Sequence, residues 1–162
     1  MTTGSNPAAA TDHDLVLTRV FDAPRELVFR AWTEPEQMAQ WFAPRMFTVP
    51  VCELDARPGG AILLHMQGPD GSVFPMKGVF NEVVPPERIV MTAGALFDED
   101  DNPALEDRTT ITFEEHEGKT TITLRVDLIK AAAEAAGALE GMEQGWNESL
   151  DKLGEHLARI AA

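Results

Sequence analysis

The sequence lacks the residues on which several large classes of protein depend. Cys52 is the one cysteine among 162 residues, so the chain cannot form an internal disulfide. No apolar run approaches the ~20 residues of a membrane-spanning helix, which predicts a soluble protein. Lys and Arg number 13 against 27 Asp and Glu, giving a net charge of −14. A chain of this charge repels phosphate backbones, so nucleic acid is not an expected partner.

The motifs of common enzyme classes are also absent. There is no Gly-x-Ser-x-Gly nucleophile motif, no phosphate-binding loop and no dinucleotide-binding fingerprint. Asp98 and Asp100 imitate the start of a calcium loop, but Pro103 and Thr109 stand where glycine and glutamate are required. No metal-ligand spacing relates the four histidines, which are His13, His65, His116 and His156. We therefore expect neither a metal nor a cofactor.

The first 13 residues are small and polar, with neither a basic start nor an apolar block. This composition predicts a disordered tail and not a signal peptide, so a cytoplasmic location is the default expectation. Residues 14–162 have the length of one ordinary domain and can bury a sizeable core.

Residue patterning predicts a strand near residues 15–21 and then two short helices. Pro24 opens the first helix, and Thr33 with Glu36 has the capping-box spacing expected at the start of the second. The pattern then changes to period two, with strands near 47–56, 60–67, 73–84, 88–97, 108–116 and 119–128. The turns between these strands are short, which predicts an antiparallel meander with one apolar face.

The C-terminal segment has the pattern of an amphipathic helix. Two glycines, Gly141 and Gly145, interrupt it, and each costs about 1 kcal/mol relative to alanine. Something near them therefore requires a small residue, either close approach to the sheet or room for a ligand. The apolar stripe that would cover the sheet consists of Leu139, Met142, Trp146, Leu150, Leu153, Leu157 and Ile160. The element order predicts an α+β domain.

Several segments together resemble a known family. They are residues 19–24, 31–33, 40–44, 55–60, 68–71, 78–80 and 84–90, and Gly145-Trp146 with Leu150 and Leu153. The chain resembles the START-like, or SRPBCC, superfamily, and within it the bacterial group similar to the C-terminal domain of the activator of Hsp90 ATPase. The resemblance implies the helix-grip fold, in which a curved seven-stranded antiparallel sheet, two short helices and a long C-terminal helix enclose an apolar cavity. Members bind lipids, sterols, hormones or polyketides, and some catalyse cyclisation.

Large, soft side chains on the apolar face are candidates to line this cavity, with the alternative that they fill a core. The candidates are Trp41, Phe47, Leu64, Met66, Met76, Phe80, Met91, Phe97, Met142 and Trp146. His65 lies in an apolar run and is the candidate polar contact or general base, with a structural histidine as the alternative. Arg108 and Arg125 are expected on the polar face, paired with acidic neighbours.

The leading hypothesis is that the protein binds a small hydrophobic or amphipathic ligand between sheet and helix, with no catalysis assigned to it. One alternative is a polyketide cyclase-like or hydratase-like enzyme in which a pocket His, Arg or acidic side chain moves protons, with His65 as the candidate. Another is a chaperone-associated or regulatory module that docks a protein partner. Open sheet edges also make a homodimer possible.

Overall fold

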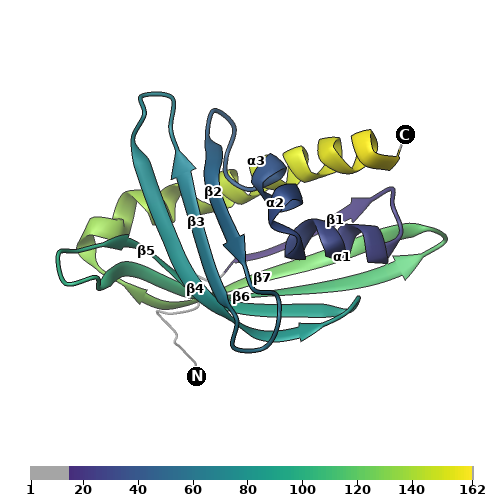
Figure 1. Cartoon of the computed structure of the whole chain (residues 1–162), viewed down its shortest axis with the longest axis horizontal. Helices are drawn as coiled ribbons and strands as arrows, with labels where there is room; N and C mark the ends of the chain where they lie inside the picture. The colour runs from purple at the N-terminus through teal and green to yellow at the C-terminus, as the bar shows by residue number, and fades with distance from the viewer. Residues whose placement is uncertain (1–14, 162) are drawn as a thin grey trace, which may run out of the picture.

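The computed structural model describes residues 15–161, so the tail predicted at residues 1–13 lies outside the described residues. Its seven strands form one antiparallel sheet in the order β1-β7-β6-β5-β4-β3-β2, which confirms the predicted meander (Figure 1). The strands are β1 (Leu15–Phe21), β2 (Thr48–Leu54), β3 (Ala61–Gln67), β4 (Val73–Val84), β5 (Arg88–Phe97), β6 (Pro103–His116) and β7 (Lys119–Ala131).

Strands β6 and β7 are longer than the prediction. β6 begins at Pro103 and not near residue 108, and β7 continues to Ala131. The register between these two strands shifts between Glu106 and Asp107, which interrupts the strict alternation from which the strand was predicted. The extra residues extend the sheet beneath the start of the last helix.

Two short helices, α1 (Arg25–Thr33) and α2 (Pro35–Trp41), connect β1 to β2. The capping box predicted at Thr33 is wrong. The Thr33 hydroxyl donates back to the carbonyl oxygen of Phe29 at 3.3 Å, because Thr33 is the last residue of α1. Glu34 is the N-cap of α2 without a side-chain cap bond, and Pro35 occupies the first turn, where its missing N–H is not needed.

The last helix, α3 (Ala136–Ala161), follows a single 3₁₀ turn, η2 (Ala133–Ala135), and runs along the length of the sheet (Figure 1). Polar contacts fasten its second half to the rest of the domain. Asp151 pairs with Arg19, Lys152 Nζ donates to the carbonyl oxygen of Ala43 at 3.0 Å, and the His156 ring lies 3.0 Å from the Gln37 amide oxygen. These anchors leave the first half of the helix to pack through apolar contacts.

The core lies beneath α1, α2 and the second half of α3. Trp32 and Trp41 meet edge to face with ring centroids 4.7 Å apart, and Trp41 Nε1 donates to the carbonyl oxygen of Ala31 at 3.0 Å. Leu150 and Leu153 of α3 are fully buried against this cluster. The arrangement of curved sheet, short helices and long C-terminal helix is the predicted helix-grip fold.

Candidate functional site

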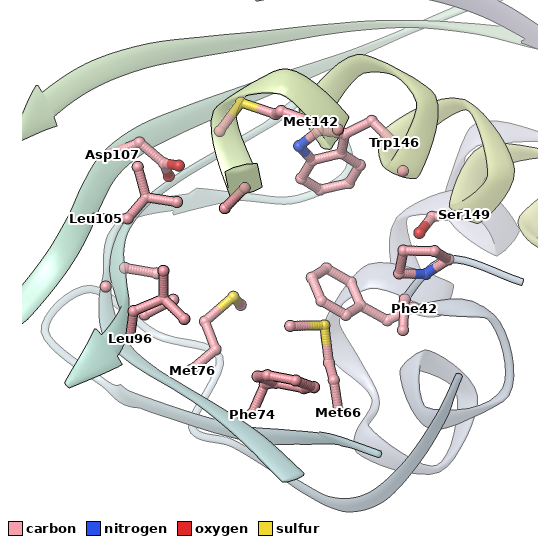
Figure 2. A pocket seen from close by; sticks show the side chains of 18 of the residues that line it. Phe42, Met66, Phe74, Met76, Leu96, Leu105, Asp107, Met142, Trp146 and Ser149 are labelled. Atoms are coloured by element: carbon pink, nitrogen blue, oxygen red, sulfur yellow. The ribbon is translucent and has the colours of Figure 1, made fainter. Parts of the chain in front are cut away.

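A cavity of about 540 Å³ lies between the first half of α3 and the sheet. The helices explain where this cavity lies. Helices α1 and α2 cover one end of the concave face of the sheet, whereas only the start of α3 covers the other end (Figure 1). The cavity is shown from close by in Figure 2. Its lining consists of Phe42, Ala43, Pro44, Phe47, Met66, Phe74, Met76, Met91, Ala93, Gly94, Ala95, Leu96, Leu105, Asp107, Thr109, Glu134, Ala138, Gly141, Met142, Gly145, Trp146 and Ser149.

Aromatic rings and methionines dominate the wall. Trp146 stands between core and cavity, with its ring edge to face with Phe42 at a centroid distance of 5.7 Å. Phe47 and Phe74 pair at 6.1 Å, and Phe74 is 38% exposed, so this pair stands where the cavity meets solvent. Methionine side chains are flexible and polarisable, so this part of the wall can adapt its shape at low cost.

The two helix glycines have different surroundings. A Cβ atom added at Gly141 would meet nothing within 4 Å, so this residue opens onto the cavity. A Cβ at Gly145 would lie 3.3 Å from Pro44 Cγ, which is a close approach of the helix to the loop after α2. Of the two reasons expected for these glycines, room for a ligand fits Gly141 and close packing fits Gly145.

The structure places part of the predicted set in the cavity wall, namely Phe47, Met66, Met76, Met91, Met142 and Trp146. Trp41, Leu64 and Phe80 are not in the wall, because they lie in the fully buried core. These three residues therefore fill the core, which was the alternative to lining the cavity.

His65 and Phe97 also lie outside the cavity lining. Leu64 is buried and Met66 lines the cavity, so the alternation of β3 directs His65 to the opposite face of the sheet. At the end of β5, Leu96 adopts a left-handed conformation with φ of 59° and lines the cavity in place of Phe97. The Phe97 ring lies 4.3 Å from Lys77 Nζ instead. His65 therefore does not serve the cyclase-like or hydratase-like alternative, which also allowed an Arg or an acidic side chain in the pocket.

Asp107, which the sequence analysis did not select, is the distinctive group of the site. It lies on β6 opposite Ala93 of β5, and both residues line the cavity. Figure 2 shows Asp107 across the cavity from Phe42 and Ser149. The Thr109 hydroxyl donates to Asp107 Oδ1 at 3.3 Å.

Burial in this apolar wall raises the pKa of the Asp107 carboxyl from an ordinary 3.8 to about 6. The Thr109 hydrogen bond opposes this rise, and the neighbouring charge of Glu106 adds to it. Apart from Asp107, Glu134 is the one ionisable residue in the lining, and it is exposed. The cavity therefore combines an apolar body with negative charge.

Arg108 and Arg125 are both exposed and do not line the cavity. Arg125 Nε donates to Asp127 Oδ1 at 2.8 Å, so one acidic partner lies on the same strand. The acidic loop after β5 forms a capped turn, in which Asp98 Oδ1 accepts the N–H groups of Asp100 and Asn102 at 2.9 Å.

Residues 15–161 contain no group of three His, Cys, Asp or Glu side chains arranged to hold a metal ion. Within the same residues, no helix combines the length and apolar character that a membrane crossing requires.

Comparison with known proteins identifies the family. The sequence model described as "Activator of Hsp90 ATPase homolog 1-like protein" matches residues 22–158. No functionally curated protein matches the chain in sequence.

Solved structures of bacterial proteins are similar over nearly the whole chain. A protein from Nitrosomonas europaea is 30% identical, with a TM-score of 0.78, and the match covers 91% of this chain and 96% of that one. A protein from Chromobacterium violaceum is also 30% identical, with a TM-score of 0.79 and coverage of 90% and 97%. The AHSA1 protein from Silicibacter pomeroyi is 27% identical, with a TM-score of 0.74 and coverage of 91% and 99%. The chain therefore belongs to the family of Activator of Hsp90 ATPase homolog 1-like proteins, within the START-like superfamily.

Proposed function

We propose that the protein binds a small apolar or amphipathic molecule in the cavity beneath the first half of α3. The observation that carries this proposal is the size of the cavity. Protein interiors are close-packed and contain few voids larger than a water molecule. A volume of about 540 Å³ is therefore no packing defect, and it lies within the range of about 300–1,000 Å³ typical of ligand sites.

The chemistry of the wall supports the same proposal. Apolar surface that leaves water on binding supplies about 25 cal/mol per Å². The Phe42, Met76 and Trp146 side chains offer such surface on different sides of the cavity (Figure 2). Phe74 is partly exposed at the boundary between the cavity and solvent, so a ligand would enter beside this ring.

The glycine at position 141 supplies a sharp test. Substitution Gly141→Leu places a side chain in the cavity without a backbone clash, since nothing lies within 4 Å of the added Cβ. Gly137 is the matched control, because it also lies in α3, has the same open surroundings and does not line the cavity. The Gly141→Leu variant should lose ligand binding, while Gly137→Leu should keep it.

Native mass spectrometry of the freshly purified proteins, followed by titration with decanol, measures this difference. The expected result is a retained small molecule or decanol adduct in the wild type and Gly137→Leu, and its loss in Gly141→Leu. Equal binding by both variants would contradict the cavity as the site. No binding by the wild type would favour the alternative of a module that docks a protein partner, such as the chaperone in the family description.

A further inference from the structure

Asp107 lies in the cavity, and the described part of the chain gives it no cationic partner. Within residues 15–161, its contact is the Thr109 hydroxyl on Oδ1, and no Lys, Arg or His pairs with it. Its neighbours across the two adjacent strands are Ala93 of β5 and Leu128 of β7, which cannot donate a side-chain hydrogen bond. Asp107 is half-buried, and a carboxylate withdrawn from water is costly unless it is paired.

The charged groups around Asp107 do not supply the missing partner. Glu106, the next residue on β6, is acidic, and Glu134 of η2 is the other ionisable residue of the lining. The α3 residues that line the cavity carry no charge, and they are Ala138, Gly141, Met142, Gly145, Trp146 and Ser149. The protein as a whole has a net charge of −14, so its field attracts cations and repels anions.

We propose that the ligand of this cavity is a cationic amphiphile, an apolar molecule with a protonated amine that pairs with Asp107. This inference rests on the proposed function, because it names the polar end of the ligand that the cavity would bind. The ammonium group donates to the carboxylate at one end, and the apolar body contacts the methionines and aromatic rings of the wall. A charge-assisted hydrogen bond of this kind also gives the ligand a fixed direction in the cavity.

The carboxyl is charged when the ligand arrives. Its pKa of about 6 leaves Asp107 mostly ionised at pH 7.5, while an alkylamine, with a pKa near that of lysine at about 10.4, is protonated. Opposite charges therefore meet in an apolar site at neutral pH. Acidification through pH 6 neutralises the carboxyl and removes the attraction.

Three probes with the same alkyl chain test the proposal: decylamine, decanol and decanoate. Binding is measured by titration calorimetry at pH 7.5 and 150 mM salt, with every probe below its micelle concentration. We expect decylamine to bind the wild type about 10- to 100-fold more tightly than decanol, the range typical of a hydrogen bond to a charged group. Decanoate should bind most weakly, because its charge repels Asp107.

Two variants assign the preference to one side chain. Asp107→Asn keeps the size of the residue and an acceptor for Thr109. The variant should lose the preference for decylamine. Its affinity for decanol should stay within about threefold of the wild type, which is the usual variation in the contribution of a single hydrogen bond. Asp100→Asn changes the net charge equally in the exposed β5–β6 loop and should keep the preference. Decanol binding also reports that each variant retains the cavity.

The pH dependence adds a second readout. The affinity of the wild type for decylamine should fall about tenfold per pH unit below about pH 6, and that for decanol should not. Equal or tighter binding of decanoate, or a decylamine preference that survives in Asp107→Asn, would overturn the cationic ligand. Decanol binding without an amine preference overturns this inference alone, whereas no binding of any probe overturns the proposed function.

Discussion

The ionised Asp107 carboxyl should destabilise the ligand-free protein at neutral pH. Its pKa rises from 3.8 to about 6 on folding, which is about two units at 1.36 kcal/mol each, or roughly 3 kcal/mol when the group is fully ionised. Substitution Asp107→Asn removes the charge and keeps an acceptor for the Thr109 hydroxyl. The variant should therefore be more stable than the wild type at neutral pH, by up to this amount.

The sign of the effect depends on pH. Well below pH 3.8 the carboxyl is protonated in both the folded and the unfolded state, so it contributes nothing. Between pH 3.8 and about 6 the unfolded chain loses its proton first, and the stability of the wild type falls as pH rises. The linkage relation gives a cost of about 1 kcal/mol at pH 4.5 and about 3 kcal/mol at pH 7.5.

Urea unfolding at these two pH values measures the effect. The difference in unfolding free energy between Asp107→Asn and the wild type should grow by about 2 kcal/mol from pH 4.5 to pH 7.5. Asp100→Asn, which changes the net charge equally at an exposed site, should show no comparable growth. A difference that is constant with pH, or a variant less stable than the wild type at pH 7.5, would refute the assignment of a half-buried, unpaired carboxylate.

Three further predictions test other parts of the structure. Burial raises the pKa of the Cys52 thiol from 9.0 to about 11, so at pH 8 its alkylation should be ~100-fold slower than in urea, and equal rates would contradict this. Leu153→Ala should reduce the unfolding free energy by about 2–5 kcal/mol, because Leu153 is fully buried, and a loss below 1 kcal/mol would mean that α3 packs loosely. His65→Ala should leave decanol affinity unchanged in calorimetry, and a tenfold loss would place His65 in the site after all.

Much of the fold could be predicted because its signals are local. Short turns between period-two segments specified the meander, and the apolar stripe of α3 specified the covering helix. The same alternation was enough to exclude His65, since Leu64 and Met66 cannot share a face of β3 with the residue between them. Selecting all three residues as cavity candidates ignored the geometry of the strand.

Asp107 was missed for a related reason. The strand was predicted to begin near residue 108, so Asp107 appeared to lie in a loop. With β6 beginning at Pro103, Leu105 and Asp107 both line the cavity, and a carboxylate at an apolar-face position is the signal that could have identified it. The start of β6 depends on its pairing with β5 and β7, so the residues near the boundary do not determine it by themselves.

The division between core and cavity could not be read from the sequence. Phe80 and Met76 lie on one strand at positions of the same parity, but the first is in the core and the second is in the cavity wall. Their difference depends on where α1 and α2 end over the sheet. Phe97 was predicted to line the cavity, but Leu96 lines it instead. This difference depends on one backbone angle, the positive φ of Leu96.

Methyl NMR of methionine residues offers the most direct test of the cavity as a ligand site. Met66, Met76, Met91 and Met142 line the cavity, whereas Met38 is buried in the core and Met46 is 76% exposed. Titration of methyl-¹³C-methionine-labelled protein with decanol should shift the four cavity methyl signals and leave those of Met38 and Met46 in place. Unchanged cavity signals at saturating decanol, or a shift confined to Met46, would contradict the account.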